Sequence, residues 1–150
     1  VKALGNNMKV YSTDVCVPIS KLVECISWAE NEVNKLGLTA PMVGHVGDGN
    51  FHSIILYDPQ DKDKQKKIRQ YSDDLINKAL ELEGTITGEH GIGLQKKHYL
   101  LKEHHDNIPV MKAIKRSLDI NNIMYKNTDA KFLYYFYNNK YYKVPTFGNV

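Results

Sequence analysis

Two short glycine-rich stretches hold the residues best suited to chemistry. GHVGDGNFH, at positions 44–52, places two histidines seven residues apart among three glycines, an aspartate and an asparagine. TGEHGIG, at 87–93, follows later and carries a glutamate beside a histidine. Neutral imidazoles and carboxylates together bind zinc, manganese or iron, and such a mixed set leaves positions open for substrate. Both stretches are therefore candidates for a metal-assisted active site.

Each candidate side chain can be given a role from its type and place. If the chain turns between His45 and His52, their imidazoles lie on adjoining strands and can point to one face. Glu89 from the second stretch then completes a His, His, carboxylate set, while Asp48 could instead orient one imidazole. Since consecutive side chains project in different directions, we assign ligation to Glu89 and proton removal to His90.

Hydrophobic periodicity and turn residues indicate which elements position these residues. A strand ends at Pro18, Ser20 is expected to cap the helix that follows, and Asp48-Gly49 is a hairpin signal. The expected order is β-α-β-β-α-β-α-α, which predicts an α+β fold, an antiparallel sheet with helices on one face in a ferredoxin-like split βαβ arrangement. The expected elements are strand 9–18, helix 20–37, hairpin strands 41–46 and 51–57, helix 58–84, strand 85–87, and helices 94–104 and 109–120.

Composition excludes several classes of protein. A hydrophobic content of 42% and a charged content of 25% are ordinary for a globular domain, and a net charge of +3 argues against nucleic acid as the main partner. The two cysteines form no CxxC, so neither a disulfide framework nor a thiolate metal site is expected. No apolar run reaches the roughly 18 residues that span a membrane. The chain does not begin with Met, and we expect its true start to lie upstream.

The sequence changes character after Met124. Residues 125–150 are rich in Tyr, Asn and Lys and show no clean period. One interpretation is a pair of aromatic strands at 131–137 and 140–147 around Asn-Asn. The other is a segment foreign to the preceding domain, and the residues alone leave both open.

Three motifs together resemble the C-terminal domain of FAD-linked oxidases. They are STDVCVPIS at 12–20, VGHVGDGNFHSIILYDP at 43–59 and GTITGEHGIGLQKKHYL at 84–100, in the order that this family shows. The similarity is greatest to the mitochondrial, cytochrome-linked D-lactate dehydrogenase group; glycolate oxidase and D-2-hydroxyglutarate dehydrogenase are relatives. The resemblance implies a substrate and metal domain over 1–124 and a divergent tail over 125–150, with the N-terminal FAD-binding domain absent.

The resemblance also implies roles for individual residues. It implies that His45, His52 and Glu89 bind a divalent metal, zinc or manganese, next to the flavin. It implies that Asn50 helps to orient the cofactor site. The metal is expected to hold the substrate's 2-hydroxyl and carboxylate while His90 takes the hydroxyl proton and hydride passes from C2 to FAD.

The resemblance further implies a substrate, a partner and a location. The D-2-hydroxyglutarate branch has a lysine at the position of Ser12, so a small monocarboxylate such as D-lactate, oxidised to pyruvate, is favoured here. An electron acceptor such as cytochrome c and a mitochondrial location are expected from the group.

The family's pattern after NNIM, at 121–124, is replaced by YKNTDAK. The FAD-binding domain is absent as well, and without it no tightly held flavin and no turnover are expected, so we expect a fragment that is inactive alone. The alternatives are a truncated, catalytically inactive metal-binding module and a standalone metal hydrolase, which the lack of HExxH disfavours.

Overall fold

The computed structural model describes residues 7–92, 96–121 and 123, and the backbone of 131–137 and 140–146. The chain forms two compact units, Val1–Gly88 and Glu89–Val150, and each is considered by itself.

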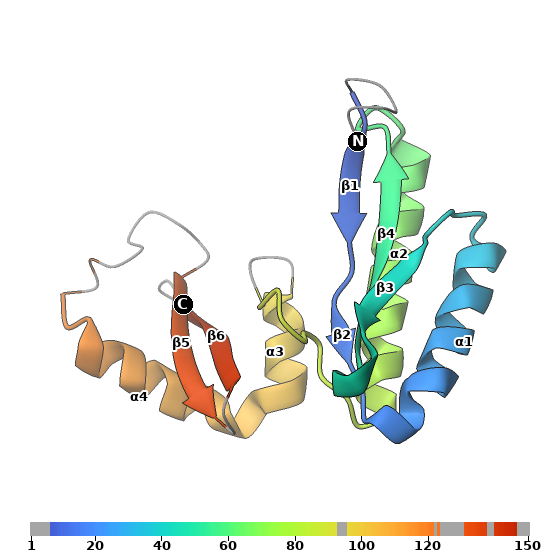
Figure 1. Cartoon of the computed structure of the whole chain (residues 1–150). Helices are drawn as coiled ribbons and strands as arrows, with labels where there is room; N and C mark the ends of the chain where they lie inside the picture. Colours follow the sequence, from blue (N-terminus) through green and yellow to red (C-terminus); the bar gives the residue numbers. More distant parts are fainter. Residues whose placement is uncertain (1–6, 93–95, 122, 124–130, 138–139, 147–150) are drawn as a thin grey trace. The chain divides into compact units, whose positions relative to one another are not determined.

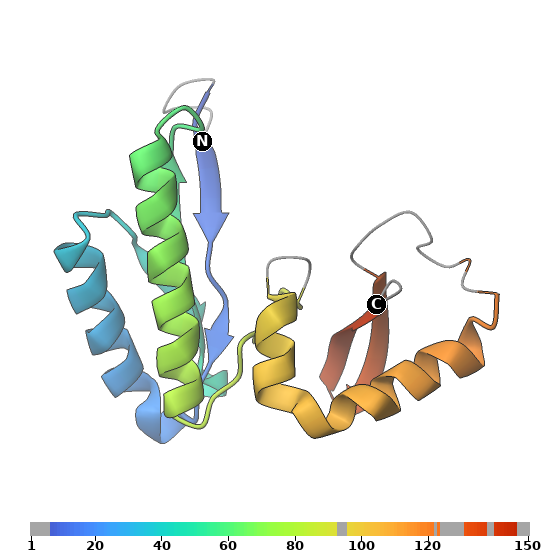
Figure 2. The same cartoon turned by 180° about the vertical axis from the view of Figure 1, so that it is seen from behind.

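The first unit is a sheet built around one central strand (Figure 1). The central strand is β4 (Asn50–Tyr57). Strands β1 (Lys9–Ser12) and β2 (Val15–Cys16) pair with one of its edges, and β3 (Met42–His45) pairs with the other, all antiparallel. Helices α1 and α2 lie together on one face of this sheet, as the reverse view in Figure 2 shows. The elements are β1 (Lys9–Ser12), β2 (Val15–Cys16), α1 (Ile19–Lys35), β3 (Met42–His45), β4 (Asn50–Tyr57) and α2 (Lys62–Glu81).

This arrangement confirms the predicted α+β fold with an antiparallel sheet. Strand β4 lies between the first strand and the strand that follows α1, which is the split βαβ order. The predicted strand at 85–87 is reduced to one antiparallel bridge between Thr85 and Cys16, with hydrogen bonds in both directions. In the described residues, the segment 85–87 therefore forms no regular strand, although Thr85 pairs with Cys16 of β2.

Alternation along β4 divides its side chains between two environments. Phe51, Ser53 and Ile55 are buried toward the helices, where the Ser53 hydroxyl lies 2.6 Å from the Tyr71 hydroxyl of α2. The side chains between them project from the opposite face. The core is completed by apolar residues of the other elements: Val15, Val17, Leu22, Cys25, Ala29, Val33, Ile68, Leu75, Ile76 and Ala79.

Two predicted helix starts are shifted. The first helix begins at Ile19 after Pro18, whose backbone lies outside the helical region, so Ser20 falls inside the first turn and does not cap it. Proline is suited to this position because it lacks an N–H and its φ is fixed. The second helix begins at Lys62 rather than near position 58, because the Asp61 carboxylate accepts a hydrogen bond from the backbone N–H of Lys64 at 2.9 Å.

The second unit is helical and ends in a strand pair. Helix α3 (Lys97–His104) and helix α4 (Ile108–Leu118) are joined by a short 3₁₀ turn. Strands β5 (Lys131–Tyr137) and β6 (Lys140–Thr146) pair antiparallel, as one of the two interpretations of the tail expects. The predicted domain boundary at residue 124 lies outside the described residues and stays a prediction. Among the residues described, none of the helices has the length and hydrophobicity that crossing a bilayer requires.

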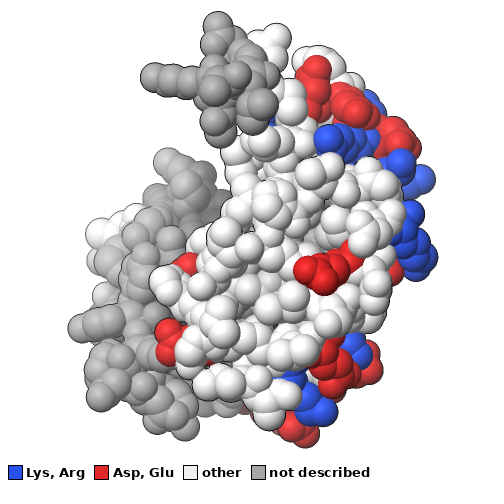
Figure 3. Space-filling view, turned by 45° about the vertical axis from the view of Figure 1, so that its right-hand side comes forward, with Lys and Arg blue, Asp and Glu red and all other residues white. Residues whose placement is uncertain are grey.

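The surface beside the hairpin is partly apolar. Figure 3 shows one face of the molecule, where most charged side chains lie near the margins and uncharged atoms fill the area between them. Separately, Val43 and Val46, on either side of His45, are both exposed. Scattered exposed apolar residues are ordinary in soluble domains. Here, two exposed valines, Val43 and Val46, lie close to His45 in the sequence.

We predict that alkaline pH destabilises the protein through its core. Burial raises the pKa of Cys25 from 9.0 to about 11 and the pKa of Tyr71 from 10.0 to about 12. The folded state therefore keeps protons that the unfolded chain releases, so this stability is fully present below about pH 9 and is lost as pH rises from 9 to 12. The thermal unfolding midpoint, measured from pH 7 to 11, should fall, and less steeply for Cys25→Ala. An equal slope in both proteins would contradict this origin.

Candidate functional site

The β3–β4 hairpin places three of the predicted site residues on one face of the sheet. His45 pairs with Asn50, and Val43 pairs with His52. Residues that pair directly across an antiparallel ladder, and those two positions along, project to the same side. His45 and His52 are therefore diagonal neighbours, a relation with a typical backbone separation of about 7–8 Å that long and aromatic side chains can bridge. This face is the one opposite the helices.

His52 is held in a single tautomer. The residue is 7% exposed, and its Nδ1 lies 2.9 Å from the backbone carbonyl oxygen of Thr13. A carbonyl oxygen can only accept, so Nδ1 carries a hydrogen, and in the neutral imidazole the lone pair is then on Nε2. Histidines that bind metals are typically anchored in this way, with the second ring nitrogen bonded to a carbonyl or carboxylate. The geometry therefore suits His52 to the ligand role predicted for it.

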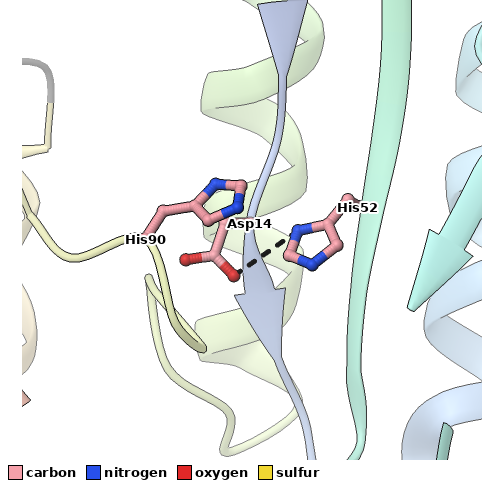
Figure 4. A group of neighbouring side chains, drawn as sticks. All are labelled: Asp14, His52 and His90. Atoms are coloured by element: carbon pink, nitrogen blue, oxygen red, sulfur yellow. Dashed lines mark ion pairs between the residues drawn. The ribbon is translucent and has the colours of Figure 1, made fainter. Parts of the chain in front are cut away.

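A buried carboxylate that the sequence reasoning missed lies beside His52. Asp14 is 1% exposed, and its Oδ1 is 3.7 Å from the Nδ1 of His52 (Figure 4). Asp48, which was considered for this role, is exposed, and its backbone carbonyl accepts the thiol hydrogen of Cys16 at 3.1 Å. The available signal was the polar pair Thr13-Asp14 inside a stretch otherwise rich in β-forming residues.

Asn50 is fixed by the hydrogen bonds of its amide nitrogen. Its Nδ2 donates to the Oδ1 of Asp14 at 2.9 Å and to the carbonyl of Val15 at 3.0 Å. Both partners are acceptors only, which settles which amide atom is nitrogen. The Oδ1 of Asn50 is buried and has no hydrogen-bond partner among the described residues. A buried carbonyl oxygen without a donor costs about 1–3 kcal/mol, so this atom is suited to receive a bound donor or cation.

The two remaining predicted residues, Glu89 and His90, come directly after Gly88, a glycine in tight contact with the Asn50 side chain. Gly88 is the last residue of the first unit, and a Cβ there would overlap the Nδ2 of Asn50 and lie 3.1 Å from the Oδ1 of Asp14. Glu89 and His90, the next two residues, begin the second unit and are exposed. Because consecutive Cα atoms are about 3.8 Å apart, the chain enters the second unit from this contact.

Comparison with known proteins assigns the class of protein. Residues 2–126 match the family described as FAD linked oxidases, C-terminal domain, and the chain belongs to this family. It is 46% identical over 123 residues to the probable mitochondrial D-lactate dehydrogenase of Danio rerio, covering 81% of this chain and 25% of that protein.

Two further relatives extend the comparison. The mitochondrial D-lactate dehydrogenase [cytochrome] of Arabidopsis thaliana is 42% identical over 123 residues, which cover 81% of this chain and 22% of that protein. Glycolate oxidase subunit GlcD of Bacillus subtilis is 37% identical over 112 residues, covering 74% of this chain and 24% of that protein. The chain thus spans about a quarter of the length of these relatives.

We predict that Gly88→Ala destabilises the fold because its Cβ overlaps the Asn50 amide. Overpacking of this kind costs about 1–3 kcal/mol, which urea unfolding can measure. Gly47→Ala is the matched control in the same set of motifs, because a Cβ at Gly47 meets no atom of the described structure within 4 Å. The control should change the free energy of unfolding by less than about 0.5 kcal/mol. Equal losses in both variants would refute the contact.

Proposed function

We propose that this chain is the substrate- and metal-binding C-terminal part of a flavin-dependent D-2-hydroxy-acid dehydrogenase that acts on D-lactate. Membership of the FAD-linked oxidase family and the names of its relatives support the oxidoreductase class. The observation that carries the proposal is the single tautomer of buried His52 beside the orphaned oxygen of Asn50. Such pre-set polar atoms are typical of sites that receive a ligand.

The residues of the proposed site fit a divalent cation, zinc or manganese. We propose His45, His52 and Glu89 as its ligands, a set of two nitrogens and one oxygen donor that suits either metal. Within the first unit, the buried carboxylate of Asp14 lies beside His52 (Figure 4), as is usual for an imidazole that binds a cation. When bound, the cation would supply positive charge beside the hydroxyl and carboxylate of the substrate.

Residues of this chain would accept the substrate proton and orient the reactants. His90 would accept the proton of the 2-hydroxyl at a ring nitrogen while C2 becomes the carbonyl carbon of pyruvate. The oxygen of Asn50, fixed by Asp14 and Val15, would accept a hydrogen bond from the bound substrate or cofactor. FAD, bound mainly by a domain outside this sequence, would supply the hydride acceptor.

The environment of Ser12 supports a substrate with one carboxylate. The side chain is uncharged, unlike the lysine of the D-2-hydroxyglutarate branch, so this position offers no cation for a second carboxylate, and its hydroxyl donates to the carbonyl of Thr13 at 3.2 Å. An electron acceptor such as cytochrome c is proposed because the name of the Arabidopsis thaliana relative includes the word cytochrome. A mitochondrial location is proposed because the names of both D-lactate dehydrogenases include the word mitochondrial.

The substrate is tested with the chain expressed together with the coding sequence that precedes it. Adding D-lactate should bleach the flavin absorbance and drive reduction of a dye, and D-2-hydroxyglutarate should do so more slowly. A preparation that binds FAD but is not bleached by D-lactate would refute the substrate. Bound FAD that neither D-lactate nor D-2-hydroxyglutarate reduces at any metal concentration would favour the catalytically inactive binding module.

The two histidine roles are separated by substitution in the same preparation. His90→Gln should lower flavin reduction about 10²–10⁴-fold, the usual contribution of a general base, and should leave metal content unchanged. His52→Gln should lower the metal content itself. His105→Gln is the control, since that side chain is 84% exposed on a helix end. Loss of metal in His90→Gln would show that His90 is a ligand instead.

A further inference from the structure

Asp14 connects three separate segments of the first unit. Its carboxylate is buried between β1 and β2, where a charge is costly unless donors surround it. The Oδ1 accepts the amide of Asn50 from β4, and the Oδ2 accepts the hydroxyl of Thr87 from the segment after α2. Both oxygens are thus used, and the donors come from the two segments that carry the site motifs.

Residues 13–15 present a row of acceptors to the hairpin. The carbonyl of Thr13 accepts from His52, the carboxylate of Asp14 accepts from Asn50, and the carbonyl of Val15 accepts from Asn50 again. Every hydrogen that His52 Nδ1 and Asn50 Nδ2 can donate is directed toward this row. The other polar atoms of these two side chains are the Nε2 of His52 and the Oδ1 of Asn50, and both are electron-pair donors when the imidazole is neutral.

We propose that Asp14 is a positioning residue for the site and that Thr87 holds it in place. The carboxylate 3.7 Å from His52 Nδ1 makes the imidazole a stronger electron-pair donor at Nε2, and its bond to Asn50 fixes the Oδ1 of that amide. The Thr87 hydroxyl keeps the carboxylate turned toward these two side chains. This inference rests on the proposed function because it requires a cation at His52.

The test measures the affinity of the 150-residue chain for Zn²⁺ and Mn²⁺ by competition with a chromogenic chelator. Asp14→Asn keeps the size of the side chain and removes its charge, and it should weaken metal binding about 10–100-fold. Thr87→Val, which removes only the hydroxyl, should weaken it about tenfold, at the lower end of that range. Thr87→Ser, which restores the hydroxyl, should recover the affinity.

A matched control separates positioning from a loss of stability. Ser72→Ala removes another buried hydroxyl of the same unit, one that accepts a hydrogen bond from Tyr11 at 3.0 Å. It should lower the thermal midpoint and leave metal affinity unchanged. If Asp14→Asn fails to fold, the Thr87 pair alone decides the outcome.

Each other outcome overturns a specific statement. Wild-type affinity in both Asp14→Asn and Thr87→Val would refute the positioning role while leaving the metal site intact. Complete loss in Asp14→Asn with full affinity in Thr87→Val would show that Asp14 is itself a ligand. A wild-type chain that binds neither metal would refute the proposed metal site, and the positioning role with it.

Discussion

The register of β4 is the constraint on which the rest of the first unit depends. Because side chains alternate along a strand, one segment places Phe51, Ser53 and Ile55 in the core and Asn50 and His52 in the site. A slip of one residue would exchange these two sets, burying the amide and imidazole under the helices. Both stability and chemistry therefore require the same pairing.

Local geometry at the hairpin enforces that pairing. Gly49 has φ +74° and packs against the carbonyl of Val17, a conformation and a contact that a side chain would oppose. Its own carbonyl accepts the backbone N–H of Val17, so the turn is joined to the chain that leaves β2. Gly49 thus helps to fix the pairing of the strands, in addition to any role in binding a ligand.

Strong periodic signals made much of the fold predictable from sequence. The long amphipathic helix with Ile68, Tyr71, Leu75 and Ala79 on its buried face, and the hairpin around Asp48-Gly49, both follow from local patterns. The start of α1 did not, because Pro18 sets the backbone there and the favourable capping type of Ser20 has no effect. Propensity is a weak guide where a neighbour fixes φ.

Candidate histidines could be chosen from the sequence because they lie in distinctive motifs, but Asp14 could not. A histidine between glycines can be recognised from the sequence alone. The partners of a buried carboxylate cannot, because Asp14, Asn50 and Thr87 come together only after the sheet has formed. Sequence reasoning therefore favoured Asp48, the carboxylate nearest along the chain, over the one nearest in space.

The Ser53–Tyr71 contact has a consequence for how the sequence can change over time. The two buried hydroxyls satisfy each other across the strand and helix. Losing either one alone leaves a polar atom stranded in the core, whereas losing both together is nearly neutral. We therefore expect positions 53 and 71 to change together among related sequences, because a replacement at one position alone would be destabilising.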